Sequence, residues 1–157
     1  MNKIIIGVLT VSLVSVLGYM ILNTTGGVSK GNENGILATI YKSPTCSCCG
    51  QYGNYLEGKG YDVQVELRPD MEQVKEEFGV PYELESCHTM EVDGYIVEGH
   101  VPEEAVHKLL TERPDIKGIG MAGMPSGSPG MPGPKNSDFV IYEINHDGTR
   151  GNIFMTI

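Results

Sequence analysis

The fold is decided by residues 36–58, which have the sequence ILATIYKSPTCSCCGQYGNYLEG. The apolar run Ile36–Tyr41 predicts a buried strand, and the cluster Cys46-Ser47-Cys48-Cys49 follows after a short link that contains a proline. A helix is predicted next, because three apolar residues recur at helical spacing before a glycine-rich stop: Tyr52, Tyr55 and Leu56. We therefore expect the cysteines to lie where a strand passes into a helix.

The next part of the chain continues this alternation of strands and helices. Apolar residues at every second position of 63–67 predict a strand, and Asp70 predicts the start of a helix that follows it. An antiparallel hairpin is predicted at 88–98 with its turn at Asp93-Gly94, and a further helix is predicted to begin at Pro102. The resulting order is β-α-β-α-β-β-α. That order predicts an α/β, thioredoxin-like fold with a central mixed sheet flanked by helices.

The C-terminal part changes in composition. Residues Lys117–Lys135 are too rich in glycine and proline for a helix or a central strand, so we predict a long Met/Gly/Pro-rich loop. Two apolar runs, Phe139–Ile144 and Asn152–Ile157, flank Asp147-Gly148 and predict a closing β-hairpin. The folded domain is thus expected to occupy residues 36–157.

The N-terminal part carries an uncharged apolar run, residues 4–22, that is long enough to cross a bilayer. We expect residues 1–22 to be a membrane anchor or an export signal, and the lack of an alanine pair after the run favours the uncleaved anchor. Residues 23–35 are rich in Gly, Asn, Ser and Thr, which predicts a flexible linker. The domain would then be extracytoplasmic (periplasmic), anchored in the inner membrane by residues 4–22 or exported with cleavage.

The charge balance narrows the class of partner. Eleven Lys and Arg residues against twenty Asp and Glu residues give a net charge of -9. Such a chain repels phosphate backbones and attracts cations, although the same acidity also serves solubility. We therefore expect no nucleic-acid partner.

The cysteine cluster contains two spacings at once, a CxxC between Cys46 and Cys49 and a CxC between Cys46 and Cys48. Unpaired N–H groups at a helix start stabilise thiolates, which makes the sulfurs better nucleophiles and better ligands. An exchange enzyme needs only two cysteines, so the third favours a soft ion such as Cu(I), and bridging sulfur would allow a multinuclear cluster. Zinc is a lesser option, because Cys48 and Cys49 are adjacent.

A second group of candidate ligands lies further along the chain. Cys87 and His88 begin the third predicted strand, where thioredoxin-like domains bring a loop, usually with a cis-proline, against the CxxC. We expect sulfur and imidazole to complete the metal site there.

Softer or less specific candidates follow in the C-terminal half. The loop methionines Met121, Met124 and Met131 could meet a soft metal or cover apolar surface. His100 could be a ligand or a hydrogen-bonded histidine at a helix entry.

Two other interpretations of the cysteines stay open. The chain could be a thiol–disulfide oxidoreductase that uses Cys46 and Cys49. It could also be a non-catalytic interaction domain stapled by two disulfides, Cys46 with Cys49 and Cys48 with Cys87. Oxidation and metal binding could alternate at the same residues.

Four motifs together resemble those of the CopG-like family of exported copper-resistance proteins, which is unrelated to the DNA-binding repressor of that name. They are CxCC at 46–49, CHT at 87–89, VDGYIVEGHVP at 92–102 and GMPSGSPGM at 123–131. The resemblance covers nearly everything from residue 36 onward. It implies a thioredoxin-like fold, copper bound by the cysteine cluster as one or several ions, and a role in converting Cu(I) and Cu(II) into one another.

Carried over residue by residue, the resemblance points to a set of four thiolate ligands. His88 and the loop methionines are further candidates, and the additional Met121 departs from the family pattern. The implied partners are copper ions, other copper-handling export or resistance proteins, an electron-transfer partner, and the membrane through the N-terminal segment. Whether the chain is a copper oxidoreductase stays open. The four thiolate ligands are Cys46, Cys48, Cys49 and Cys87.

Overall fold

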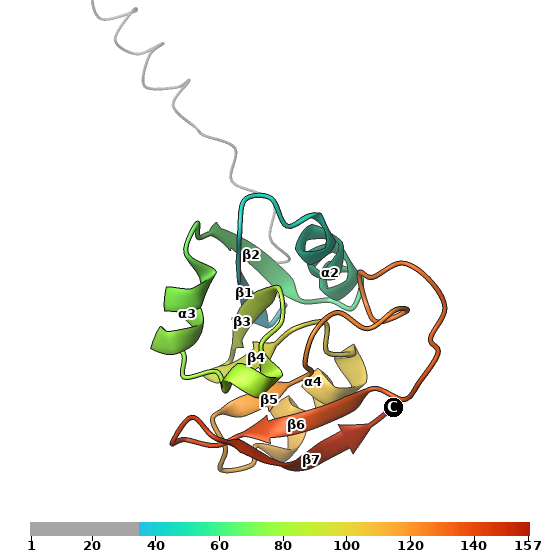
Figure 1. The fold of residues 1–157 in the computed structure, drawn as a ribbon. Coiled ribbons are helices and arrows are strands. Elements are labelled where there is room, and N and C mark those ends of the chain that lie inside the picture. The colour runs from blue at the N-terminus through green and yellow to red at the C-terminus, as the bar shows by residue number, and fades with distance from the viewer. Residues whose placement is uncertain (1–34) are drawn as a thin grey trace, which may run out of the picture. The chain divides into compact units, whose positions relative to one another are not determined.

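The structure is a computed structural model, and it describes residues 35–157 (Figure 1). The membrane anchor or signal and nearly all of the linker that the sequence predicts lie outside these residues. In the described part of the chain, no helix is both long and apolar enough to cross a membrane.

Seven strands form one mixed sheet in residues 35–157. They are β1 (Leu37–Lys42), β2 (Asp62–Leu67), β3 (His88–Val92), β4 (Tyr95–Glu98), β5 (Gly118–Gly120), β6 (Val140–Ile144) and β7 (Arg150–Thr156). Their order across the sheet is β2-β1-β3-β4-β5-β6-β7. The pairs β1–β2 and β4–β5 are parallel and the other neighbouring pairs are antiparallel. The predicted α/β fold with a mixed sheet and a C-terminal hairpin is confirmed.

Helices cover both faces of this sheet (Figure 1). They are α2 (Ser47–Glu57), α3 (Met71–Glu77), α4 (Glu103–Glu112) and the short 3₁₀ helix η1 (Tyr82–Leu84). Helices α2 and α4 pack on one face and form the main core with the sheet, whereas α3 and η1 lie on the other face with a smaller apolar cluster. The main core is fully buried at positions that include Ile40, Tyr52, Leu56, Met90, Val97, Leu109 and Ile119.

Local sequence signals explain several of these elements. Asp70 caps α3, because its Oδ1 accepts a hydrogen bond of 3.2 Å from the backbone N–H of Gln73. The β3–β4 turn places Asp93 at φ 48° and Gly94 at φ 83°, the left-handed conformation that a tight hairpin turn requires. Both elements had been predicted, and both lie at the predicted residues.

The prediction of a loop over Lys117–Lys135 is wrong at its start. Gly118–Gly120 forms β5, a central strand between β4 and β6. Glycine is needed there because a Cβ on Gly118 would collide with the carbonyl group of Ile96 on β4. Ile119 supplies the apolar side chain of the strand and is fully buried in the main core. From residue 121 to residue 139 the chain has no helix or strand.

Candidate metal centre

The start of α2 carries three of the four cysteines. Cys46 occupies the N-cap position, and Cys48 and Cys49 lie in the first turn of the helix. The fourth, Cys87, immediately precedes β3, and the pairing of His88 with Lys42 at the end of β1 brings it to the same end of the sheet. The four Sγ atoms all lie within 4.8 Å of one another. The fold thus gathers the cysteines that the sequence had singled out.

The four sulfurs divide into a bonded pair and a free pair. Cys46 and Cys49 form a disulfide, whereas Cys48 and Cys87 are free thiols. The two free sulfurs are 3.8 Å apart, and each also lies 3.5 Å from one sulfur of the disulfide: Cys48 from Cys46, and Cys87 from Cys49. Of the two disulfides in the stapled interpretation, the structure therefore contains the first and lacks the second.

Two histidines extend the cluster. His88 begins β3 and His100 follows β4, and both side chains are fully buried. Cys87 Sγ lies 3.0 Å from Nε2 of His100 and 3.4 Å from Nδ1 of His88. Cys87, His88 and His100 thus form a second group whose ligand atoms lie within 4.8 Å of one another, and it shares Cys87 with the first group.

The hydrogen bonds of the two histidines define what each ring nitrogen can do. Nδ1 of His100 is 2.6 Å from the carbonyl oxygen of Pro129, which can only accept, so this nitrogen carries the proton and Nε2 presents a lone pair to Cys87. Nε2 of His88 is buried and has no hydrogen-bond partner within residues 35–157. A buried nitrogen without a partner is costly. The nitrogen of His88 that faces Cys87 is Nδ1, so Nδ1 is the atom that a metal ion at the cysteines would meet.

Burial shifts the titration of these groups. It lowers the pKa of both imidazoles, and electrostatic repulsion from His100 when that ring is protonated, and from Lys75 and Lys42, lowers the pKa of His88 further. Both rings are therefore neutral at pH 7, the form that binds metals. Burial, followed by the charge of Cys48, raises the pKa of Cys87 to about 12. This cysteine remains a thiol until a ligand displaces its proton.

Tyr52 contacts the site, although the sequence identified it only as an apolar residue at helical spacing. Its ring centroid lies 4.7 Å from that of His88 and 5.6 Å from that of His100, and its hydroxyl donates a hydrogen bond of 2.9 Å to the carbonyl oxygen of Val101. The side chain is fully buried, so it fixes the position of both rings. Its spacing of about one helical turn from Cys48 and Cys49 is the signal that could have identified it.

A buried ionic network on the other face of the sheet was also missed. Glu98 on β4 forms an ion pair with Lys75 on α3. Its carboxylate accepts hydrogen bonds of 2.6 Å from the hydroxyl of Thr89 and 2.6 Å from the backbone N–H of Ser86. Ser86 directly precedes Cys87, so the network holds the segment that carries this cysteine. Nothing in the sequence pairs Lys75 with Glu98.

The methionines of the loop have three different environments. Met121 is 2% exposed and belongs to the main core, whereas Met124 is 53% exposed at the surface. Met131 lines a surface hollow of about 500 Å³ together with Cys48. The loop approaches α2 closely here, since a Cβ on Gly130 would lie 2.9 Å from the carbonyl oxygen of Cys48. Met131 is thus the loop methionine that the fold brings beside a cysteine.

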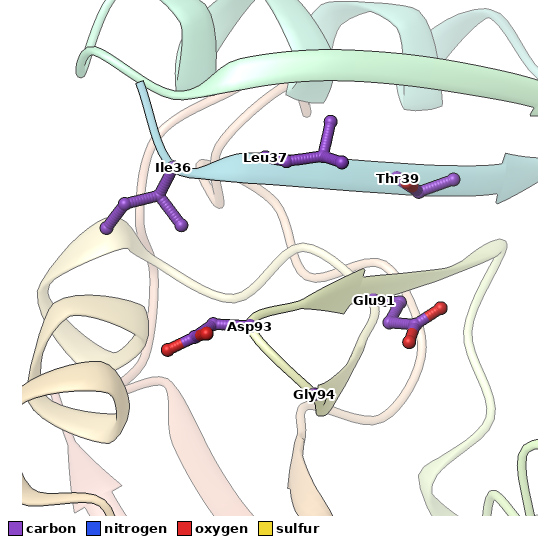
Figure 2. Close-up of a pocket in the computed structure, with 6 residues that line it drawn as sticks. All are labelled: Ile36, Leu37, Thr39, Glu91, Asp93 and Gly94. Carbon is purple, nitrogen blue, oxygen red and sulfur yellow. The ribbon is translucent and has the colours of Figure 1, made fainter. Parts of the chain in front are cut away.

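A second hollow, of about 310 Å³, lies away from the cysteines (Figure 2). It occupies the end of the sheet where Ala38 pairs with Val92, opposite to the end where Lys42 pairs with His88. No cysteine, histidine or methionine lines it, so it is not part of the metal centre. Its lining residues are Ile36, Leu37, Thr39, Glu91, Asp93 and Gly94.

Comparisons with known proteins identify one family model and two solved structures that this chain resembles. Residues 84–131 match a family model described as "Protein of unknown function, DUF411". A solved structure titled "Copper resistance protein copG- Form 2" is 34% identical, with a TM-score of 0.73, and the match covers 79% of this chain and 99% of that one. A second, titled "Form 1", is 34% identical, with a TM-score of 0.72 and coverage of 79% and 98%. The curated proteins gave no match.

Proposed function

The chain belongs to the CopG family of copper resistance proteins, and on that premise we propose that it binds Cu(I) through Cys46, Cys48, Cys49 and Cys87. The observation that carries the proposal is the cluster of four Sγ atoms within 4.8 Å of one another. Thiolates are the ligands that Cu(I) prefers, and sulfurs this close can bridge more than one ion. His88, His100 and Met131 are the further ligands in this proposal.

The proposal includes the fold and the place of the protein in the cell. The strand order β2-β1-β3-β4, with β3 antiparallel to β1, supports a thioredoxin-like fold. The apolar run at residues 4–22 supports a periplasmic domain held at the inner membrane. Other copper-handling export or resistance proteins would then be its partners.

We also propose that the site interconverts Cu(I) and Cu(II). Its donor set supports this, because it combines thiolate sulfur, which favours Cu(I), with neutral imidazole, which also binds Cu(II). An electron-transfer partner would be needed for repeated turnover.

Anaerobic titration of the reduced full-length chain with Cu(I), against a competing chelator, tests copper binding. We expect the Cys48→Ser/Cys87→Ser variant to bind Cu(I) roughly 100-fold more weakly than the wild type. Ser47→Ala, a change between two of the cysteines, is the matched control and should bind as the wild type does. Equal affinity in the double variant and the wild type would remove the proposed site.

A second candidate function is thiol–disulfide exchange, and the disulfide between Cys46 and Cys49 at the start of α2 favours it. An insulin-reduction assay separates the two functions. Activity that survives Cys48→Ser and is unaffected by copper would support the exchange enzyme.

A further inference from the structure

We propose that the four cysteines divide into two pairs: Cys46 and Cys49 supply the electrons that reduce Cu(II), and Cys48 and Cys87 retain the Cu(I) that forms. The inference rests on the proposed copper-binding function. It adds the source of the electrons and assigns a separate task to each pair of cysteines.

The covalent state of the sulfurs is the first argument. Cys46 and Cys49 are joined across the first turn of α2 with their Cα atoms 5.7 Å apart, inside the range of about 4.4–6.8 Å that disulfides require. This pair can therefore be oxidised without moving the helix. The dithiol form of the same pair holds two electrons that it can donate.

The free pair has a separation that suits retention of an ion. The Sγ atoms of Cys48 and Cys87 are 3.8 Å apart, well beyond the S–S bond length of about 2.05 Å. Metal–thiolate bonds are about 2.3 Å long for zinc, so two sulfurs that share an ion of that kind lie within roughly 4.6 Å of each other. The pair is thus placed to share an ion.

The product also keeps nitrogen ligands after the disulfide has formed. Cys87 Sγ lies 3.0 Å from Nε2 of His100 and 3.4 Å from Nδ1 of His88. Two thiols and two imidazoles therefore remain beside the disulfide. Oxidation of Cys46 and Cys49 removes two ligands from the cluster without emptying it.

Each electron-donating sulfur has one retaining sulfur beside it. Cys48 lies 3.5 Å from Cys46, and Cys87 lies 3.5 Å from Cys49. Two Cu(II) ions, one bound to each retaining cysteine, would each contact one sulfur of the dithiol. Two one-electron acceptors can then take the two electrons together, which avoids a one-electron-oxidised sulfur.

The reaction balances with the groups named. The S–H bonds of Cys46 and Cys49 break, two protons leave to solvent, and one S–S bond forms between the two sulfurs. The two electrons released reduce two Cu(II) ions to two Cu(I) ions. A single turnover needs no other reductant, because the dithiol is the reductant and Cu(II) is the oxidant.

A single-turnover experiment on the full-length chain tests this division. The fully reduced protein, freed of reductant under anaerobic conditions, is mixed with excess Cu(II). The Cu(I) formed is measured with a chromogenic Cu(I) chelator, and the remaining thiols are alkylated and mapped by mass spectrometry. We expect about two Cu(I) ions per chain and one disulfide, between Cys46 and Cys49.

Two variants separate the tasks. Cys46→Ser removes one electron-donating sulfur, and serine also suits the N-cap position, so the helix start is preserved. Its Cu(I) yield should fall at least about tenfold. Its affinity for added Cu(I) should fall by less than the yield does, because the retaining pair and both imidazoles remain. Cys48→Ser should still form the Cys46–Cys49 disulfide, but it should lose Cu(I) to the chelator at a roughly tenfold lower chelator concentration. Circular dichroism checks the fold of both.

The outcomes distinguish this inference from the proposed function. A wild type that binds added Cu(I) but leaves Cu(II) unreduced, or that oxidises Cys48 with Cys87, would overturn the division of tasks and leave copper binding standing. A wild type that fails to bind added Cu(I) would overturn the proposed function itself. Equal Cu(I) yields from Cys46→Ser and the wild type would also overturn the inference.

Discussion

At the scale of single residues, the site depends on side chains whose polar atoms are buried. His88 lies against Tyr52 with Nδ1 directed at Cys87 and Nε2 without a hydrogen-bond partner among residues 35–157. On the other face of the sheet, Glu98 is paired with Lys75 and accepts a hydrogen bond from the backbone N–H of Ser86, the residue before Cys87. Such groups stabilise the site only while each has its partner, so their substitution has large and predictable effects.

The depressed pKa of His88 predicts how the stability of the metal-free chain depends on pH. The unfolded chain takes up a proton on this ring near pH 6.5, whereas burial keeps the folded ring neutral. Unfolding therefore binds a proton below pH 6.5, and the free energy of unfolding should fall by up to about 1.4 kcal/mol per pH unit per buried histidine. Urea unfolding at pH 7.5 and pH 5.5 measures this loss.

The substitution His88→Phe isolates the contribution of that ring. It keeps an aromatic ring against Tyr52 and removes the titrating group, so the pH-dependent loss should shrink by the share of one histidine. His107→Phe at an exposed position of α4 is the control and should leave the loss unchanged. An undiminished loss in His88→Phe would show that other groups cause the acid sensitivity.

The ion pair between Glu98 and Lys75 makes a second prediction at this scale. Glu98→Gln leaves the ammonium group of Lys75 buried without its counter-charge and should destabilise the fold by roughly 3–5 kcal/mol. The double variant Glu98→Gln/Lys75→Met should recover most of this loss, because it removes the unpaired charge. Chemical denaturation of the two single variants and the double variant measures the coupling. A double variant as unstable as Glu98→Gln would contradict the argument.

At the scale of elements, two junctions build the site. The link from β1 to α2 places three cysteines on a helix start, and the segment before β3 delivers the fourth. Strand β5 then inserts between β4 and β6 and directs the chain into the loop that returns over α2. Figure 1 shows this loop passing beside α2.

Strand β5 depends on the absence of a side chain at Gly118. In Gly118→Ala the new Cβ would collide with the carbonyl group of Ile96, so we expect a loss of at least about 2–3 kcal/mol in the free energy of unfolding. Gly50→Ala is the matched control. Nothing lies within 4 Å of a Cβ there, and Gly50 lies within α2, so it should stabilise the chain by about 0.5–1 kcal/mol. Equal stability of the two variants would contradict the strand's packing.

Local signals made most elements predictable, and non-local packing made the others unpredictable. Asp70 and the Asp93-Gly94 turn act within a few residues, so the sequence identifies α3 and the β3–β4 hairpin. The three residues of β5 carry a loop-like composition, and only the adjacent carbonyl group of Ile96 explains why glycine occurs in a central strand. A contact of that kind has no counterpart in local sequence.

The same distinction applies to the candidate site. The third cysteine of the CxCC and the position of Cys87 before a strand indicated the cluster. The states of the sulfurs, the contact of Tyr52 with both imidazoles and the Glu98 network depend on distances between separate elements. The loop methionines show the limit of prediction from sequence. Met121 is buried in the core and Met124 is exposed at the surface, and this difference follows from the path of the loop.

At the scale of the whole molecule, the site exists only in the folded chain, because its ligands come from segments far apart in sequence. Cys48 and Cys87 are 39 residues apart, and His100 follows after two further strands, β3 and β4. An unfolded chain presents the same thiols without their mutual positions. Metal binding should therefore favour the folded state.

This linkage predicts that Cu(I) raises the thermal stability of the reduced chain. Free Cu(I) at about 100 times Kd should add about 2.7 kcal/mol to the free energy of unfolding, and removal of the metal with a chelator should reverse the change. Anaerobic thermal denaturation followed by circular dichroism measures the shift. The Cys48→Ser/Cys87→Ser variant should lose most of it, and an equal shift in this variant would indicate binding elsewhere.

The contact between His100 and Pro129 has an evolutionary consequence. The histidine meets a main-chain carbonyl oxygen, which every amino acid provides. Substitution of Pro129 would therefore leave the acceptor in place as long as the path of the backbone over α2 is kept. Gly130 cannot change in the same way, because a Cβ there would lie 2.7 Å from the backbone nitrogen of Tyr52. Insertions and deletions between residues 121 and 130 would shift that oxygen and misalign the imidazole. Homologues should thus keep the length of this segment together with its GMPSGSPGM motif.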